Sequence, residues 1–126
     1  MSLVIQLRDN RTAFSPREQI SGTVSWQFDA PPTSAELRLV WATSGRGRRY
    51  LSVVETIPFA NPQPTESRAF TFTLPDGPYS FSGKLITLTW ALELALDPDS
   101  QLVEQEITVG PGGNAVMLSQ VARRSS

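Results

Sequence analysis

Hydrophobic and polar residues alternate along most of the chain with the period of two that is typical of a β-strand. In one such run, Ile20, Val24 and Trp26 share a face, while serines and threonines occupy the other. The longest run extends from Ile86 to Leu96. Seven strands are predicted in this way, over residues 3–7, 20–28, 35–41, 51–59, 70–74, 86–96 and 103–109.

Two irregularities interrupt the alternation. Gly22 occupies an inward position of its strand, which predicts a bulge or a close approach of another segment. In residues 51–59, Glu55 falls at a position where the parity requires an apolar residue, and Val54 falls on the polar side. The alternation of this fourth strand is therefore the least regular of the seven.

Turns rich in proline, glycine and aspartate separate the predicted strands. They lie at residues 15–18, 29–32, 44–47, 61–64, 75–78 and 97–100. Short strands at such spacing predict an all-β fold, an immunoglobulin-like antiparallel β-sandwich of about seven strands over residues 1–109. Residues 110–126 begin Gly-Pro-Gly-Gly and are predicted to be a flexible C-terminal tail or linker, although residues 115–118 are apolar enough for an edge strand or docking segment.

Composition narrows the chemistry that the domain can perform. The 126 residues suit one domain, and the formal net charge of -1 gives no overall attraction to nucleic acid or membrane. Histidine and cysteine are absent, which removes the commonest general base, disulfides and thiolate metal sites. The N-terminus is charged too early for a signal peptide, and no apolar run is long enough to span a bilayer. We expect a cytoplasmic protein without a cofactor, a metal or an integral membrane segment.

Three segments carry a resemblance to a known family. "FSPREQISGTVSW" (residues 14–26) resembles the opening signature of arrestin-like domains, and "LRLVWAT" (37–43) resembles the core strand that follows. "FTFTLPDGPYSFSGKLITLTWALEL" (70–94) resembles the phenylalanine-alternating strand, the Leu-Pro corner and the next long strand of that family. The match extends over roughly residues 3–109, in the order that the family uses. The resemblance implies an arrestin-like sandwich of the N-terminal type and a scaffold-like, protein-binding role.

The chain departs from the arrestin-like pattern in two respects. Arrestins generally contain two such sandwiches and share a cradle between them, whereas this chain has room for one. Arg17 stands where the family often has glycine, so we expect the turn before Glu18 to avoid a positive φ.

The densest charge cluster is the loop that contains Arg46, Arg48 and Arg49. Three guanidinium groups on a glycine-flanked hairpin are suited to bind phosphate or carboxylate groups, such as those of phosphorylated or acidic segments or lipid headgroups. The simpler interpretation is a solvated hairpin tip. Nucleic acid is not expected as a partner, because no aromatic stacking platform accompanies the loop.

Aromatic residues divide into a core set and a marginal set. Trp26, Trp41 and Trp90 all have inward parity and are assigned to the core. Tyr50 and Tyr79 lie at loop or strand margins, so they join the arginines as candidate binding residues. Phe81 lies at a similar margin, where parity does not decide between packing on the core and facing a partner.

No combination of residues predicts catalysis or metal binding. Asp97, Asp99 and Ser100 resemble a fragment of a calcium loop, but turn chemistry explains them better. The isolated carboxylates are those of Glu18, Glu55 and Glu93, and the sequence places no two of them together. Ser82 and Lys84 are a weak candidate for a Ser-Lys pair, because Gly83 between them is typical of a bend.

Three hypotheses follow from these patterns. The first is a non-enzymatic arrestin-like scaffold that binds an unidentified protein partner, or forms a homodimer, through its open edge strands. The second is an anion-binding module that uses the arginine loop. The third is a hydrolase, which requires a cleft with perturbed carboxylates.

Overall fold

The computed structural model describes residues 2–45, 48–83, 86–98, 100–113 and 116–117, the side chains of Arg48, Val116 and Met117 excepted. Within these residues lie ten strands and two short 3₁₀ segments. They are β1 (Ser2–Leu7), η1 (Arg8–Asn10), β2 (Ala13–Phe14), β3 (Gln19–Gln27), β4 (Ser34–Gly45), β5 (Arg48–Pro58), β6 (Thr65–Thr73), β7 (Phe81–Ser82), β8 (Thr87–Asp97), β9 (Gln101–Val109), η2 (Pro111–Gly113) and β10 (Val116–Met117). The strands of six or more residues are β1, β3, β4, β5, β6, β8 and β9. Each overlaps one of the seven predicted runs, although β6 begins five residues before its predicted start at Phe70.

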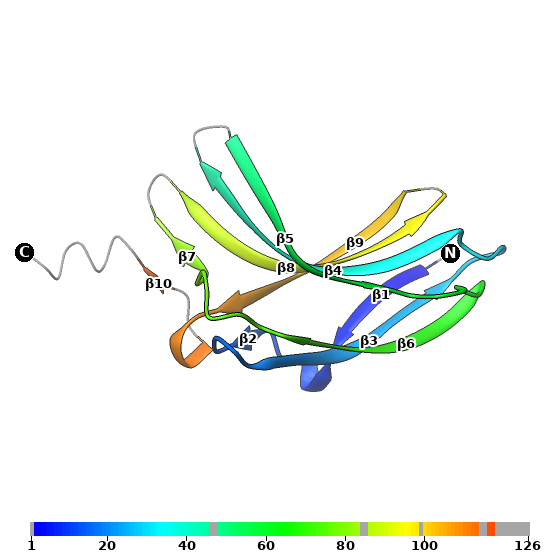
Figure 1. Ribbon diagram of the computed structural model, residues 1–126, viewed down its shortest axis with the longest axis horizontal. Helices are drawn as coiled ribbons and strands as arrows, with labels where there is room; N and C mark the ends of the chain where they lie inside the picture. Colours follow the sequence, from blue (N-terminus) through cyan, green and yellow to red (C-terminus); the bar gives the residue numbers. More distant parts are fainter. Residues whose placement is uncertain (1, 46–47, 84–85, 99, 114–115, 118–126) are drawn as a thin grey trace, which may run out of the picture.

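The strands form two sheets that pack face to face (Figure 1). The smaller sheet has the order β1-β3-β6 and is antiparallel throughout. In the larger sheet, β4 pairs with β5 on one side and with β8 on the other. The second edge of β8 is shared by β7, at its first two residues, and by β9. Two short parallel additions, β2 on β9 and β10 on β7, complete the larger sheet. The predicted all-β sandwich is confirmed.

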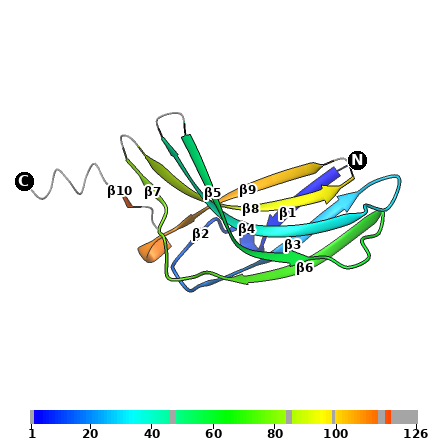
Figure 2. The same cartoon turned by 45° about the horizontal axis from the view of Figure 1, so that its top comes forward.

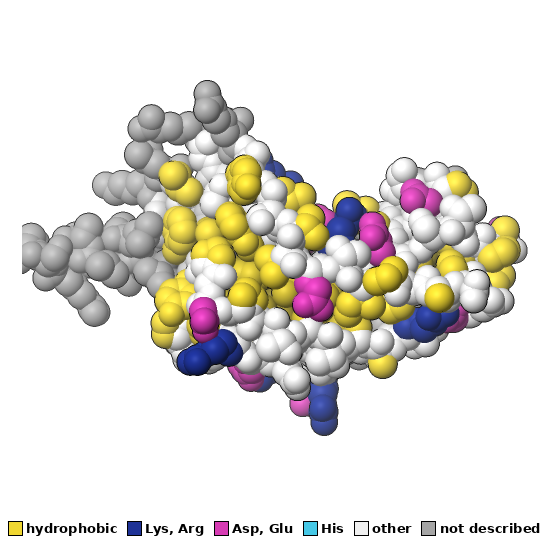
Figure 3. All heavy atoms as spheres, viewed as in Figure 1, with side chains coloured by type: hydrophobic (Ala, Val, Ile, Leu, Met, Phe, Trp, Pro, Cys, Tyr) yellow, Lys and Arg dark blue, Asp and Glu magenta, His cyan; other side chains and the backbone are white. Residues whose placement is uncertain are grey.

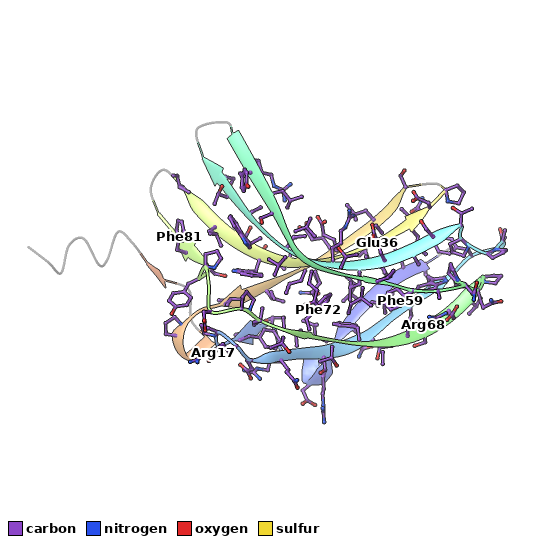
Figure 4. The ribbon with its side chains drawn as sticks, in the orientation of Figure 1. Arg17, Glu36, Phe59, Arg68, Phe72 and Phe81 are labelled. Atoms are coloured by element: carbon purple, nitrogen blue, oxygen red, sulfur yellow. The ribbon has the colours of Figure 1, made fainter. Side chains whose placement is uncertain are left out.

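The hydrophobic core fills the space between the two sheets. Its side chains come from the inward positions of the seven long strands, as the period of two requires. Phe72 lies near its centre (Figure 4), and Trp26 and Trp90 are completely buried. Each of these two indole N–H groups donates a hydrogen bond to a backbone carbonyl, that of Gln63 at 2.7 Å and that of Pro78 at 2.8 Å. The predicted core positions of Trp26 and Trp90 are confirmed, while Trp41 is half-buried against the same core.

Gly22 lies where β1 and β6 both approach β3 closely. It lies opposite Leu7 in one ladder and opposite Phe70 in the other. A Cβ atom at this position would lie 2.3 Å from the carbonyl oxygen of Gln6 and 2.9 Å from the ring of Phe70. The close approach that the sequence predicts is therefore confirmed.

The irregular parity of the fourth predicted strand corresponds to a β-bulge in β5. The register between β4 and β5 shifts at Leu39 and Val40, whose partners are Glu55 and Val53. Val54 is the extra residue of β5. Glu55 keeps its inward parity, because it lies opposite the core residue Leu39. The bulge reverses the facing of the residues before it, so that Val53 lies opposite Val40, outside the core cluster.

The corner between β6 and β8 is fixed by buried hydrogen bonds. The backbone N–H of Ser80 donates to the carbonyl of Val109 at 2.6 Å, and the hydroxyl of Ser80 accepts a bond from the Val109 N–H at 2.9 Å. Phe81 packs against the core, whereas Tyr79 remains exposed. The corner is thus a structural connection, with Tyr79 as its outward-facing aromatic residue.

The turn before Glu18 corrects the expectation for Arg17. The N–H of Glu18 bonds the carbonyl of Ser15 at 3.2 Å, and Arg17 adopts a φ of 68° despite its side chain. A turn with Pro16 in its second position and a positive φ in its third normally takes glycine there. The N–H of Arg17 donates to the carbonyl of Pro75 at 3.3 Å, which holds the residue in this conformation.

The tail contributes one short element within its described residues. Val116–Met117 forms β10, which pairs in parallel with Phe81–Ser82 of β7. Of the alternatives for residues 115–118, the edge strand is the one observed over these two residues. The flexibility of residues 110–126 as a whole stays a prediction.

Candidate functional site

Three buried apolar side chains lie on the side of the larger sheet that faces away from the core. Trp41 and Trp90 are opposite each other in the β4–β8 ladder and point inward. Because side chains alternate along a strand, their neighbours Val40 and Ala91 point outward. Val40, Ala42 and Ala91 are all buried, yet none of them belongs to the core cluster. The larger sheet therefore has an apolar floor on its outer side.

The outer side of the smaller sheet is different. It carries mainly serine, threonine and glutamine side chains from β1, β3 and β6. Some pair across the strands, such as Ser21 with Thr71 at 3.3 Å and Ser25 with Ser67 at 3.4 Å. Such neutral polar residues are typical of a solvated sheet face. The apolar floor is thus a property of the larger sheet alone.

Curvature of the larger sheet explains how outward side chains become buried. The β4–β5 hairpin rises at one end and the β8–β9 turn at the other, so the outer side is concave (Figure 1). Figure 2 shows β9, β8, β4 and β5 side by side across it. In the space-filling view, this side is hollowed between two raised ends, with acidic and basic side chains in the hollow (Figure 3). We call this outer side of β4, β8 and β9 the concave face.

A row of charged side chains crosses the concave face beside the apolar floor. Arg38 of β4 lies opposite Glu93 of β8, which lies opposite Glu104 of β9. The Nε atom of Arg38 is 3.7 Å from the Oε1 atom of Glu93, and its Nη1 atom is 3.8 Å from the Oε1 atom of Glu36. Among the residues that the structure describes, the buried Nε atom of Arg38 has no hydrogen-bond partner. The row thus holds a donor that the sandwich itself does not satisfy.

Glu93 is the most perturbed acid of this row. The residue is only 7% exposed, and this burial raises the pKa of its carboxyl above the ordinary value. The nearby charges of Arg38 and Arg49 oppose the rise, whereas the carboxyl of Glu104 adds to it through a hydrogen bond and repulsion. The surroundings of Glu93 therefore disfavour the charged form of its carboxyl.

The rim of the concave face is formed by exposed residues of β9. Leu102, Glu104 and Glu106 project from it on alternate positions, opposite Ala95, Glu93 and Ala91 of β8. Glutamates therefore outnumber arginines on the face. The face combines an apolar floor with a net acidic border.

The structure separates the binding residues that the sequence suggested. Arg46 lies outside the described residues, as does the side chain of Arg48. Arg49 is exposed opposite Ser44, on the outer side, whereas Tyr50 has inward parity and its ring centroid lies 5.9 Å from that of Trp41. Tyr79 lies at the β6–β8 corner, away from this hairpin in the chain. The described residues bring no basic cluster together, and they give the anion-binding alternative no support.

The candidate catalytic and metal residues are engaged elsewhere. The carboxylate of Glu18 accepts hydrogen bonds from Arg11 and from the N–H of Ser15, which lower its pKa. Asp97 accepts a bond from the hydroxyl of Ser34 at 3.0 Å, next to a pocket of about 280 Å³ at the end of the sandwich. Asp99 and Lys84 lie outside the described residues. In the described part of the chain, no three acidic, histidine or cysteine side chains gather as metal ligands would.

Sequence reasoning missed the pairing of Glu93 with Glu104. The sequence does contain a signal for this pairing. A turn at residues 97–100 joins two alternating strands, and residues 93 and 104 are equally far along the chain from its centre, so a hairpin places them opposite each other. Alternation within a single strand reveals neither the register of this hairpin nor the curvature of the sheet. No helix within the described ranges has the length and apolar character needed to cross a bilayer.

Comparisons with known proteins support the fold and nothing finer. No family model matches the chain, and no curated protein sequence is significantly similar to it. Among solved structures, the sporulation control protein Spo0M from Bacillus subtilis superposes with a TM-score of 0.63 at 22% identity. The match covers 86% of this chain and 49% of Spo0M, so the chain spans about half the length of that protein.

Two further structures superpose less well. A superoxide reductase (neelaredoxin) from Ignicoccus hospitalis gives a TM-score of 0.43 at 14% identity, covering 86% of this chain and 80% of that one. A β-glucosidase from Listeria innocua gives 0.46 at 12% identity, covering 87% and 16%. These scores are too low to carry an argument. The likeness to Spo0M shows that the chain has the arrestin-like β-sandwich fold.

Proposed function

We propose that this domain is a non-enzymatic interaction module of the arrestin-like type. Its concave face binds a segment of a partner protein that carries apolar and basic side chains. The observation that carries the proposal is the exposed rim of the concave face, where Leu102 stands in one row with Glu104 and Glu106. Concave, mostly apolar surfaces with a few convergent polar groups are typical of binding sites.

The chemistry of the partner follows from the charges of the face. Glu104 and Glu106 are exposed on the rim, and Glu93 lies buried behind them. A lysine or arginine of a partner would relieve the repulsion between Glu93 and Glu104, while its apolar neighbours would pack against the exposed Leu102.

The non-enzymatic part of the proposal rests on the state of the carboxylates. Glu18 is held by Arg11 and a backbone N–H at a turn, where it serves the turn geometry. Glu93 and Glu104 adjoin the apolar floor without a serine, histidine or lysine beside them among the described residues of the face. Acid pairs alone, without a substrate-binding cleft, do not constitute a hydrolytic site.

Selection from a displayed library of random peptides tests the proposal. We expect the selected peptides to be enriched in lysine or arginine and in apolar residues. The double variant Glu104→Lys/Glu106→Lys is expected to weaken their binding by about tenfold or more, because it reverses the charge of the rim. Asp29→Lys is the matched control, since it reverses an exposed acid in the loop before β4 and should leave binding unchanged.

Two results would contradict the proposed function. One is the selection of acidic or uncharged peptides. The other is equal loss of binding in the rim variant and in Asp29→Lys, which would show that overall charge and not the concave face decides the affinity.

A further inference from the structure

A pocket lies at one end of the sandwich, between the loop that joins β3 to β4 and the turn that joins β8 to β9. Both connections lie at the same end of the molecule in Figures 1 and 2. The N–H of Thr33 donates to the carbonyl of Asp97 at 3.0 Å, and the hydroxyl of Ser34 donates to the carboxylate of Asp97 at 3.0 Å. These bonds hold the loop against the turn. The space that remains between them has a volume of about 280 Å³, and we call it the end pocket.

The walls of the end pocket are mainly apolar. Leu96 and Pro32 are buried and close its inner end. The accessible apolar surface comes from the half-buried ring of Phe28 and from the exposed Pro31 and Pro98. Proline rings are rigid, so little conformational entropy is lost when a ligand packs against them.

The charges that line the end pocket all have the same sign. Asp29 and Asp97 are exposed lining residues, and no lysine or arginine joins them among the described residues of the pocket. None of the ion pairs within the described part of the chain includes either carboxylate. The end pocket therefore presents two negative charges beside an apolar wall, without a positive charge of its own.

We propose that the end pocket binds a small organic cation, namely an ammonium group on an aliphatic or aromatic body. The apolar body packs against Phe28 and Pro31, and the ammonium group lies near the carboxylates of Asp29 and Asp97. The volume is close to the lower limit of ligand pockets, about 300 Å³, so the ligand is a small molecule. The two carboxylates repel an anion of the same shape.

This site is separate from the concave face. Leu96 belongs to the core cluster and Phe28 packs against it, so the end pocket opens from the inner side of the larger sheet. The concave face is the outer side of β4, β8 and β9. Substitutions of the rim acids and of the pocket acids therefore test the two proposals separately. Normal amine binding in a rim variant that no longer binds peptides, or the reverse, distinguishes the failure of one proposal from that of the other.

A titration with three matched compounds tests the charge of the ligand. 2-Phenylethylammonium, 2-phenylethanol and 3-phenylpropionate share a phenyl ring and differ in the charge of the group that it carries. We expect the ammonium compound to bind the full chain with a Kd of about 1 mM or tighter, and to shift the amide NMR signals of Phe28, Thr33 and Gln101. The other two compounds should bind about tenfold more weakly.

Three results of this titration would overturn the proposal. One is the absence of shifts at about 10 mM of the ammonium compound. Another is an equal response to all three compounds. The third is a set of shifts at Glu93 and Glu104 and none at the end pocket, which would show that the acids of the concave face attract the amine.

Substitution of the carboxylates tests the site itself. Asp29→Asn and Asp97→Asn should each weaken the binding of 2-phenylethylammonium about threefold, and the double variant about tenfold, because each exposed charge contact contributes modestly. Asparagine at position 97 keeps a side-chain oxygen that accepts the bond from Ser34, and unchanged amide signals outside the pocket confirm the fold.

Asp76→Asn is the matched control for these variants. It removes an exposed carboxylate at the β6–β8 corner, outside the end pocket, and should leave the affinity for the amine unchanged. Parent-like affinity in the double variant, or an equal loss of affinity in Asp76→Asn, would contradict the assignment of the end pocket.

Discussion

At the scale of single residues, Arg17 shows how a turn can override the preference of its side chain. Its φ of 68° lies in the left-handed region, where a side chain other than that of glycine or asparagine is strained by about 1 kcal/mol or more. The guanidinium group forms an ion pair with Asp76 at 3.1 Å, but both side chains are largely exposed. Such a surface pair contributes little to stability.

Arg17→Gly is therefore expected to stabilise the fold. The removal of backbone strain outweighs the greater entropy of glycine in the unfolded chain, and the net gain should be about 0.5–1 kcal/mol. Urea unfolding followed by tryptophan fluorescence measures it. Arg17→Ala is the control, because it loses the ion pair and keeps the strain. If alanine stabilises as much as glycine, strain at this φ is not the cause.

Glu93 is the residue at which the concave face is expected to affect stability. Its pKa is raised in the folded state, chiefly by burial, so the folded protein binds this proton more tightly than the unfolded chain does. The contribution of Glu93 to stability therefore falls as the pH rises through the raised folded pKa, and the penalty is fully present above that pKa. Below the ordinary value of 4.5, the group is protonated in both states and the penalty disappears.

Glu93→Gln is expected to raise the melting temperature at pH 7 and to change it little at pH 4 and below. Glu18→Gln is the control of opposite sign, because hydrogen bonds from Arg11 and from the Ser15 N–H lower the pKa of Glu18. Glu18→Gln should lower the melting temperature at pH 7, and this loss of stability should become smaller as the pH falls. A destabilised Glu93→Gln at pH 7 would show that the ion pair with Arg38 outweighs burial.

At the scale of elements, the ladder of β3 depends on the absence of a side chain at Gly22. A Cβ there would lie 2.3 Å from a backbone oxygen of β1, which moves only if the strand moves. Gly22→Ala should therefore destabilise the fold by about 2–3 kcal/mol, at the upper end of overpacking. Gly77→Ala is the matched control, because nothing lies within 4 Å of its added Cβ. Comparable losses at both positions, measured by urea unfolding, would exclude steric contact as the reason.

The strands themselves were largely predictable, and for a physical reason. A strand buried on one face must alternate, so the seven alternating runs correspond to the seven long strands. Even the irregular parity at Val54 and Glu55 was visible as the trace of a bulge. What alternation alone does not reveal is the positive φ of Arg17, because this depends on the bond from its N–H to Pro75, 58 positions away along the chain.

At the scale of the whole molecule, the candidate site was not predictable from the residues taken one strand at a time. Val40 and Ala91 have outward parity, and a flat sheet would expose both of them to solvent. They are buried because the larger sheet bends, and Glu93 meets Glu104 because the β8–β9 hairpin fixes their register. Curvature and register arise from the packing of two sheets, which single-strand patterns do not encode.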